Sequence, residues 1–121
     1  MKRILYVEDD FTNALVMQRL LKTHYEVIHV TTGEECLSRL THERFDLILM
    51  DINLGRGNMD GVETLHRIRA TPDLRRMIVI TVTSYAMPED EDRFLNEGFD
   101  AYLSKPLNRQ ILLDKLFQYL A

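Results

Sequence analysis

Carboxylate, hydroxyl and amine side chains stand at the ends of four short apolar runs, and together they have the chemistry of a phosphoryl-transfer site. They are the acids Glu8, Asp9, Asp10 and Asp51, the hydroxyls Thr83, Ser84 and Ser104, and the amine Lys105. Carboxylates that are held together repel one another unless a proton or a cation lies between them. Mg²⁺ binds one or two carboxylates together with water and phosphate oxygens, so acids gathered in this way predict a magnesium site.

The same residues suggest a reaction. An aspartate beside a bound divalent cation can attack a phosphoryl group and form an aspartyl-phosphate. This transfer depends mainly on positioning and on neutralising the phosphoryl oxygens. Lys105 supplies positive charge, and the Thr83 hydroxyl can donate a hydrogen bond to a phosphoryl oxygen. The chemistry therefore favours acceptance of a phosphoryl group, with Mg²⁺ (or Mn²⁺) as the cofactor.

Five apolar runs must position these groups, and they cover residues 4–7, 27–30, 47–50, 77–82 and 101–103. Their nearly continuous hydrophobicity is typical of parallel strands that are covered on both faces. Between and after them, apolar residues recur at helical spacing, near residues 14–21, 36–40, 62–68, 94–95 and 111–120. The alternation predicts a doubly wound α/β domain with five parallel strands and five helices. The carboxyl ends of the strands, where such sheets bind ligands, then share one edge.

The fourth predicted helix has the weakest pattern. Pro88 suits its first turn and Gly98 its end, but Glu89–Asp92 is a continuous acidic run. Only Phe94 and Leu95 are expected to be buried there, whereas in the last helix Ile111 is expected to belong to the buried stripe together with Leu112, Leu116 and Leu120.

Length and composition agree with one globular domain over residues 1–121. The chain has 15 basic and 19 acidic residues, a net charge of −4, and 45% hydrophobic residues. The acidic balance argues against direct nucleic-acid binding. We expect no membrane segment and a cytoplasmic location, because no apolar run approaches the length of a membrane span and the acids that follow residue 7 do not suit a signal peptide. The single cysteine, Cys36, is expected to be a small buried side chain.

Five motifs in order give the sequence a resemblance to the receiver domain of two-component response regulators, over essentially its whole length. They are Val7-Glu8-Asp9-Asp10, Met50-Asp51-Ile52-Asn53, Met59-Asp60-Gly61, Thr83-Ser84 and Tyr102-Leu103-Ser104-Lys105-Pro106. The resemblance implies a flavodoxin-like sheet with strand order 2-1-3-4-5, which is the order known for this family.

The resemblance also implies a role for each site residue. Asp51 is expected to be the phosphoacceptor, and the Mg²⁺ ligands are expected to be Glu8, Asp9, Asp51 and the backbone carbonyl of Asn53. Thr83 and Lys105 match the hydroxyl and the lysine that face the phosphoryl group. Tyr102 matches the aromatic residue that moves with the threonine on activation, and the Lys105–Pro106 bond is expected to be cis.

The resemblance further implies a phosphorylation-dependent signalling switch rather than an enzyme. A histidine kinase or a histidine phosphotransfer protein is expected to donate the phosphoryl group. A downstream protein is expected to dock on the fourth helix, fifth strand and fifth helix, which leaves the acidic run either as part of that surface or as a solvated face. We expect a monomer or weak homodimer with no output domain in this chain.

Two departures from the family pattern flank the site. The segment from Leu54 to Asn58 is two residues longer than usual, with Gly55 where proline is expected. We hypothesise that Arg56 swings toward the phosphoryl group. Tyr85 stands two residues after Thr83, where a bulky ring is expected to slow hydrolysis of the acyl phosphate.

Two alternatives concern the whole chain. A receiver-like module that binds partners without phosphorylation is the main one, although the intact acids and lysine speak against it. A phosphatase that forms an aspartyl-phosphate commonly needs an aspartate two residues after the nucleophile, and Asn53 occupies that position. Asp10 is left open between a helix cap and an outer ligand of the metal.

Overall fold

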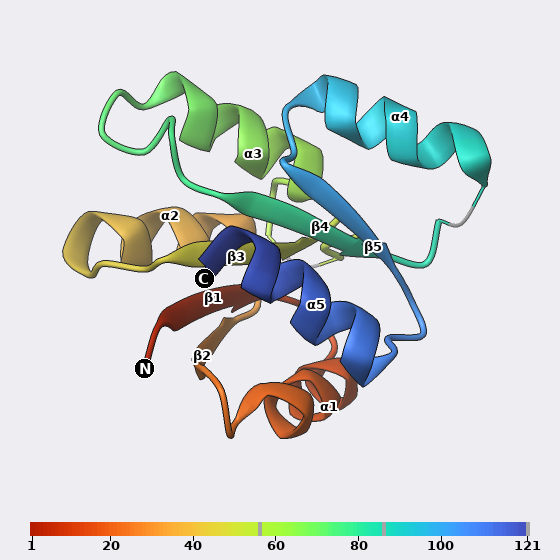
Figure 1. Ribbon diagram of the computed structural model, residues 1–121. Helices are drawn as coiled ribbons and strands as arrows, with labels where there is room; N and C mark the ends of the chain where they lie inside the picture. The colour runs from red at the N-terminus through yellow and green to blue at the C-terminus, as the bar shows by residue number, and fades with distance from the viewer. Residues whose placement is uncertain (56, 86, 121) are drawn as a thin grey trace.

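Strands and helices alternate without exception through residues 1–55, 57–85 and 87–120, which this computed structural model describes (Figure 1). The strands are β1 (Arg3–Val7), β2 (Glu26–Val30), β3 (Leu47–Asp51), β4 (Val79–Thr83) and β5 (Ala101–Ser104). The helices are α1 (Phe11–Leu21), α2 (Gly33–His42), α3 (Gly61–Ala70), α4 (Pro88–Glu97) and α5 (Arg109–Leu120). The strands pair in parallel in the order β2-β1-β3-β4-β5, which confirms the predicted fold.

The register of the sheet decides which residues reach its carboxyl edge together. Val7 pairs with Met50, Asp51 with Val82, and Thr83 with Ser104. Every residue of β3 and β4 is buried, as expected for central strands covered on both faces. The polar residues that end or follow these strands are therefore held by the best-packed part of the molecule.

Two layers of helices cover the sheet, with α1 and α5 on one face and α2, α3 and α4 on the other (Figure 1). On the first face, Met17 of α1 and Leu116 of α5 pack in one cluster with Tyr6 of β1. On the second face, Cys36 of α2, Leu65 and Phe94 form part of the other cluster. The expectation that Cys36 is a small buried side chain is confirmed.

Some predictions about individual apolar residues were wrong. Ile111 is 60% exposed, and Leu113 is buried in its place, because α5 turns its Leu112–Leu113 side toward the sheet. Leu95 of α4 is also exposed. The fourth strand begins two residues later than its apolar run, because the Met77 amide is still bonded to the Leu74 carbonyl in the preceding turn.

The helix signals of α4 fare better. Pro88 occupies the first turn, and Gly98 ends the helix in the left-handed region with φ of 119°. The acidic run is not uniformly solvated, because Asp90 is buried, accepts from the Met87 amide and pairs with Arg93. Asp90 therefore has a structural role, because it binds the backbone amide at the start of α4.

Gly61 joins the end of β3 to the start of α3 at very close range. Its amide donates to the Ile52 carbonyl at 2.9 Å, and a Cβ atom at this position would overlap the backbone carbonyl oxygen of Asp51. We expect Gly61→Ala to lower the free energy of unfolding by about 1–3 kcal/mol, because backbone must move to make room. Urea denaturation followed by circular dichroism measures this.

Gly55→Ala is the control for this substitution. Its added Cβ would meet only the movable Asp9 carboxylate, at 2.9 Å. The loss of stability should therefore be smaller than in Gly61→Ala, and equal losses would contradict the steric argument.

Candidate metal centre at the carboxyl edge of the sheet

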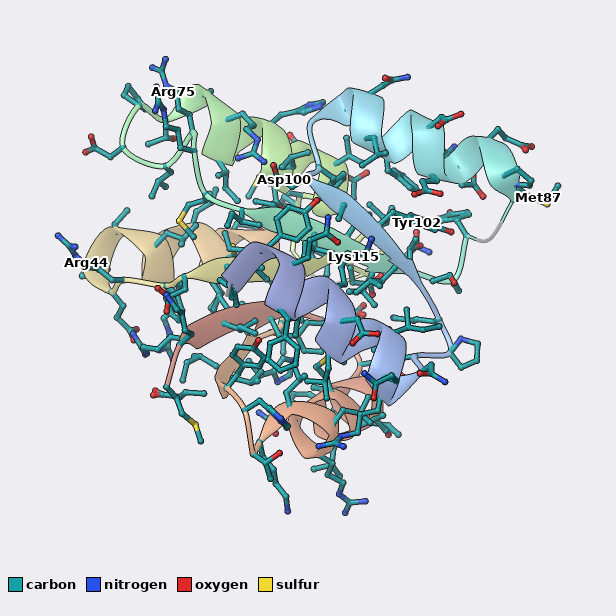
Figure 2. The ribbon with its side chains drawn as sticks, viewed as in Figure 1. Arg44, Arg75, Met87, Asp100, Tyr102 and Lys115 are labelled. Carbon is teal, nitrogen blue, oxygen red and sulfur yellow. The ribbon has the colours of Figure 1, made fainter. Side chains whose placement is uncertain are left out.

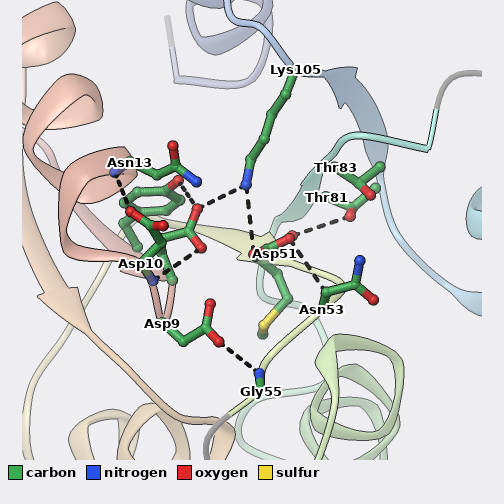
Figure 3. A network of polar contacts seen from close by, with 12 residues as sticks. Asp9, Asp10, Asn13, Asp51, Asn53, Gly55, Thr81, Thr83 and Lys105 are labelled. Carbon is green, nitrogen blue, oxygen red and sulfur yellow. Dashed lines mark hydrogen bonds and ion pairs between the residues drawn. The ribbon is translucent and has the colours of Figure 1, made fainter.

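Three carboxylates converge at the carboxyl edge of the sheet. Glu8 and Asp9 follow β1, and Asp51 is the last residue of β3. Each offers an oxygen atom, and these oxygens lie within 4.8 Å of one another. Lys105, which follows β5, reaches into the same cluster (Figure 3). The structure thus brings together residues that are separated by up to 97 positions in the sequence.

Glu8 is the most deeply held of the three acids, with only 1% of its surface exposed. Its Oε1 atom accepts from the Tyr6 hydroxyl at 2.8 Å and from Lys105 Nζ at 2.9 Å. Burial pushes the pKa of Glu8 upward, but hydrogen bonds with Asp51, Lys105 and Tyr6 outweigh it and hold the pKa below its usual value. Glu8 therefore carries the negative charge of the buried cluster.

The pKa of Asp51 shifts in the opposite direction to that of Glu8. Its Oδ2 atom lies 3.6 Å from Lys105 Nζ, and its Oδ1 atom lies 3.4 Å from the Asn53 amide. Burial, together with the hydrogen bond to Glu8 and the charge of Glu8, raises the pKa of Asp51 to about 7. Two acids share one lysine here, so a further cation or a proton is needed to balance them. This donor set, all hard oxygen atoms, fits Mg²⁺.

Asp9 is held by the longer loop that the sequence singled out. Its Oδ2 atom accepts from the Gly55 amide at 2.7 Å (Figure 3). The same loop is tied to α2, because the Asn58 amide donates to Glu34 Oε2 at 2.7 Å. The hypothesis about Arg56 concerns a residue that lies outside the described ranges.

The remaining predicted residues surround this cluster. Asn53 lies two residues beyond Asp51, and its amide lies 3.4 Å from Asp51 Oδ1. Thr83 is fully buried, and its Oγ1 atom accepts from the Tyr85 amide at 3.2 Å. The Tyr85 hydroxyl lies 3.4 Å from Asn53 Oδ1. The Lys105–Pro106 bond is cis, as predicted.

Tyr102 links the site to helix α4. Its hydroxyl donates to the backbone carbonyl of Tyr85, and its ring stacks on Phe94 with centroids 6.3 Å apart. Arg93 lies over the Tyr85 and Phe94 rings, at 5.5 and 4.5 Å from their centroids. Met87, at the start of α4, points away from the body of the molecule (Figure 2). Tyr85 is thus joined to β5 by a hydrogen bond, and α4 is joined to β5 by the stacking of Phe94 on Tyr102.

Two acids beside the site have structural roles. Asp10 Oδ1 caps α1 by accepting from the Asn13 amide at 2.9 Å, and Asp60 caps α3 through the Glu63 amide at 2.8 Å. For Asp10, the structure supplies the helix cap of the two alternatives that the sequence left open.

Sequence reasoning did not find the groups that hold the acids in place. These are the Tyr6 hydroxyl, the Gly55 amide and His29, whose Nε2 atom lies 2.6 Å from the Glu8 carbonyl. The contact between Tyr6 and Glu8 could have been predicted, because residues two positions apart along a strand face the same side. The Gly55 and His29 contacts depend on tertiary structure that no local pattern encodes.

The raised pKa of Asp51 predicts that this carboxylate destabilises the metal-free chain at neutral pH. The unfolded chain loses the Asp51 proton near pH 3.8 and the folded chain near 7. Stability should therefore fall as the pH rises through this window, because the folded state must give up a proton that it binds more tightly. The lowered pKa of Glu8 acts only below its ordinary 4.5.

We expect Asp51→Asn to remove this dependence. Between about pH 5 and pH 8, the parent should lose about 2–3 kcal/mol of unfolding free energy relative to Asp51→Asn. Urea denaturation in EDTA at several pH values measures the difference, and added Mg²⁺ should reduce it. Parallel pH profiles for the two proteins would contradict the assignment.

Comparisons with known proteins agree with one another. The sequence model of the family described as "Response regulator receiver domain" matches residues 4–117. The chain is 35% identical over 120 residues to the polar-differentiation response regulator DivK of Brucella anthropi, covering 98% of this chain and 96% of that protein.

Solved structures give the same result. A CheY-like receiver domain protein from Methanospirillum hungatei is 37% identical with a TM-score of 0.83, covering 98% of this chain and 92% of that one. The receiver domain of a sensor histidine kinase from Pseudomonas aeruginosa is 33% identical with a TM-score of 0.87, covering 98% and 96%. That crystal structure has a magnesium ion coordinated in the active site cleft.

No helix among residues 1–55, 57–85 and 87–120 combines the length and the apolar character that a membrane span requires.

Proposed function

The chain belongs to the response regulator receiver domain family of two-component systems, and from this premise we propose that it is a switch controlled by phosphorylation of Asp51. The observation that carries the proposal is the cluster of Glu8, Asp9 and Asp51 beside Lys105 at one edge of the sheet. A histidine kinase or a histidine phosphotransfer protein is the donor. We propose a regulatory phosphoacceptor that assists its own phosphorylation and dephosphorylation and has no separate substrate.

Each residue of the cluster has a task in the transfer. An oxygen of the Asp51 carboxylate attacks the phosphorus atom, the phosphorus–nitrogen bond of the donor breaks, and its electron pair returns to the imidazole. Lys105, already 3.6 Å from Asp51 Oδ2, moves its charge from Glu8 toward the phosphoryl oxygens. Thr83 donates its hydroxyl to one of these oxygens.

A divalent cation would balance the negative charge of the carboxylates that Lys105 leaves uncompensated. Glu8, Asp9 and Asp51 would hold Mg²⁺ or Mn²⁺ through their carboxylates, and Asn53 through its backbone carbonyl. The metal would neutralise the charge that develops on the phosphoryl oxygens. The magnesium ion in the similar Pseudomonas aeruginosa receiver domain supports this assignment.

We propose that the switch passes from the site to the α4-β5-α5 surface, where a downstream protein docks. Thr83 is bonded to the Tyr85 amide, and Tyr102 is bonded to the Tyr85 carbonyl. When Thr83 turns to a phosphoryl oxygen, Tyr102 repacks with it and shifts the population of two surface states. The exposed Met87 and Leu95 give α4 apolar contacts for a partner. We expect a cytoplasmic monomer or weak homodimer.

Intact-mass spectrometry after incubation with acetyl phosphate and Mg²⁺ tests the proposal. We expect the mass of one phosphoryl group to be gained, and the gain to be absent when EDTA replaces Mg²⁺. If the chain gains no mass under conditions that label a known receiver domain, the alternative stands, namely an interaction module that works without phosphorylation.

Tyr85 leads to a prediction about the lifetime of the phosphoryl group. Its hydroxyl lies 3.4 Å from Asn53 Oδ1, which supports a role for the ring in keeping water from the acyl phosphate. We expect Tyr85→Ala to shorten the half-life several-fold in a dephosphorylation time course. Tyr85→Phe, which keeps the ring, is the control and should stay near the parent value; a half-life in Tyr85→Ala equal to that of the parent would contradict the shielding role.

A further inference from the structure

A buried phenol stands directly behind the metal centre. Tyr6 lies on β1 with 1% of its surface exposed, and it belongs to the cluster packed against α1 and α5. Its hydroxyl donates to Glu8 Oε1 at 2.8 Å. Burial, with the nearby charge of Glu8, raises the pKa of Tyr6, so this group remains a neutral donor. A hydroxyl buried this deeply needs a partner, and Glu8 is the partner it has.

The Glu8 backbone is fixed from the neighbouring strand. The Glu8 amide donates to the Val30 carbonyl at 3.0 Å, and His29 Nε2 lies 2.6 Å from the Glu8 carbonyl. A carbonyl oxygen can only accept, so Nε2 carries the hydrogen of this bond. The Phe11 ring meets His29 edge-on with centroids 5.7 Å apart. The backbone and the side chain of Glu8 are therefore held by different residues.

Two donors bind the same oxygen of Glu8, Oε1. Tyr6 approaches from the core, and Lys105 Nζ, at 2.9 Å, approaches from the site. Among the described residues, Glu8 Oε2 receives no short hydrogen bond from a backbone amide or a lysine: the Asp10 amide lies 3.4 Å away, and the neighbouring acid Asp51 also contacts the Glu8 carboxylate. This oxygen is consequently the one left for a cation or for a water molecule bound to it.

We propose that Tyr6 is a positioning residue of the metal centre, which fixes the Glu8 carboxylate so that Oε2 faces the cation. The proposal rests on the function proposed above. Without the phenol, Lys105 is the remaining donor to Oε1 and draws the flexible Glu8 side chain toward itself. Binding a cation must then order Glu8 as well, and partners that orient a metal-binding carboxylate commonly change affinity by about 10–100-fold.

The test compares Mg²⁺ affinities by isothermal titration calorimetry, with Mg²⁺ as the only ligand. We expect Tyr6→Phe, which removes a single oxygen atom, to raise the Mg²⁺ Kd about 10-fold. Tyr119→Phe is the matched control. Its hydroxyl donates to the Asp100 carbonyl at 3.0 Å, away from the site, and its removal should change Kd less than about 2-fold.

A double-mutant cycle separates positioning from a general loss of structure. If Tyr6 acts through Glu8, then Tyr6→Phe should change Kd by less than about 2-fold when Glu8→Gln is already present. A structural defect would weaken binding equally in both backgrounds and would overturn the proposal. A tighter Kd in Tyr6→Phe would also overturn it, because the phenol would then only withdraw charge from Glu8.

The outcomes distinguish this proposal from the function on which it rests. A parent chain that binds Mg²⁺ and accepts a phosphoryl group, with Tyr6→Phe identical to it, refutes the role of Tyr6 and leaves the function intact. A parent chain that binds no Mg²⁺ refutes the proposed metal centre itself.

Discussion

The mass gain from acetyl phosphate and Mg²⁺ is expected to fall to background in Asp51→Asn. The amide nitrogen and oxygen of asparagine keep the shape of the side chain, but they lack the carboxylate charge that attacks phosphorus. Asp51 is buried at the end of β3, where the neighbouring strands hold its backbone, so the substitution changes the chemistry and leaves the scaffold in place. Intact-mass spectrometry followed by peptide mapping measures the labelled fraction and its position.

Asp60→Asn is the matched control for this experiment. Asp60 also lies near the site, but it caps α3 through the Glu63 amide, and asparagine is an equally good cap. Asp60→Asn should be labelled at close to the parent level. Undiminished labelling in Asp51→Asn, or a labelled peptide that lacks residue 51, would assign the phosphoacceptor elsewhere.

Lys105→Met is expected to produce the second large effect, on both stability and phosphorylation. Lys105 is the cation that Glu8 and Asp51 share, at 2.9 and 3.6 Å. Removing one partner of a buried ion pair costs about 3–5 kcal/mol. Lys105 is one-fifth exposed, so we expect a loss of about 1–3 kcal/mol near pH 8. The initial rate of phosphorylation should fall about 100-fold, because a preorganised charge is absent from the transition state.

Mg²⁺ gives this prediction a second measurement. With Lys105 absent, the two acids repel each other more strongly, so saturating Mg²⁺ should raise the unfolding temperature of the variant more than that of the parent. Lys22→Met, which removes an exposed lysine at the end of α1, is the control and should match the parent. An equal Mg²⁺ effect in Lys105→Met and the parent would show that Lys105 does not compensate these carboxylates.

The strands and helices were predictable because hydrophobicity follows local, repeated patterns, whereas the strand order came from the family resemblance. Continuous apolar runs such as residues 47–50 predicted buried parallel strands, and the structure has them. Ile111 shows where this reasoning ends: its spacing suits the buried stripe, yet α5 rotates so that Leu113 packs inward. The rotation of a helix depends on the whole surface beneath it, which a sequence pattern does not specify.

The residues that form the site were predictable from the sequence, but the hydrogen bonds that hold its acids in place were not. Asp51 and Lys105 stand at strand ends, so the parallel topology alone brings them to one edge. The hydrogen bond from Gly55 to Asp9 depends on the path of a loop with two glycines, whose backbone freedom leaves many paths open. Tyr6 was overlooked because an aromatic residue in a strand is ordinarily part of the core.

The backbone of Tyr85 makes two hydrogen bonds. Its amide donates to the Thr83 hydroxyl, and its carbonyl accepts from the Tyr102 hydroxyl. Both hydrogen bonds are made by the backbone of one residue, so a movement of that backbone shifts both partners. A conformation in which only Thr83 or only Tyr102 has rearranged breaks one of these bonds and keeps the other. The rearrangements of Thr83 and Tyr102 should therefore be linked, so that each molecule favours the conformation in which both have occurred or neither has.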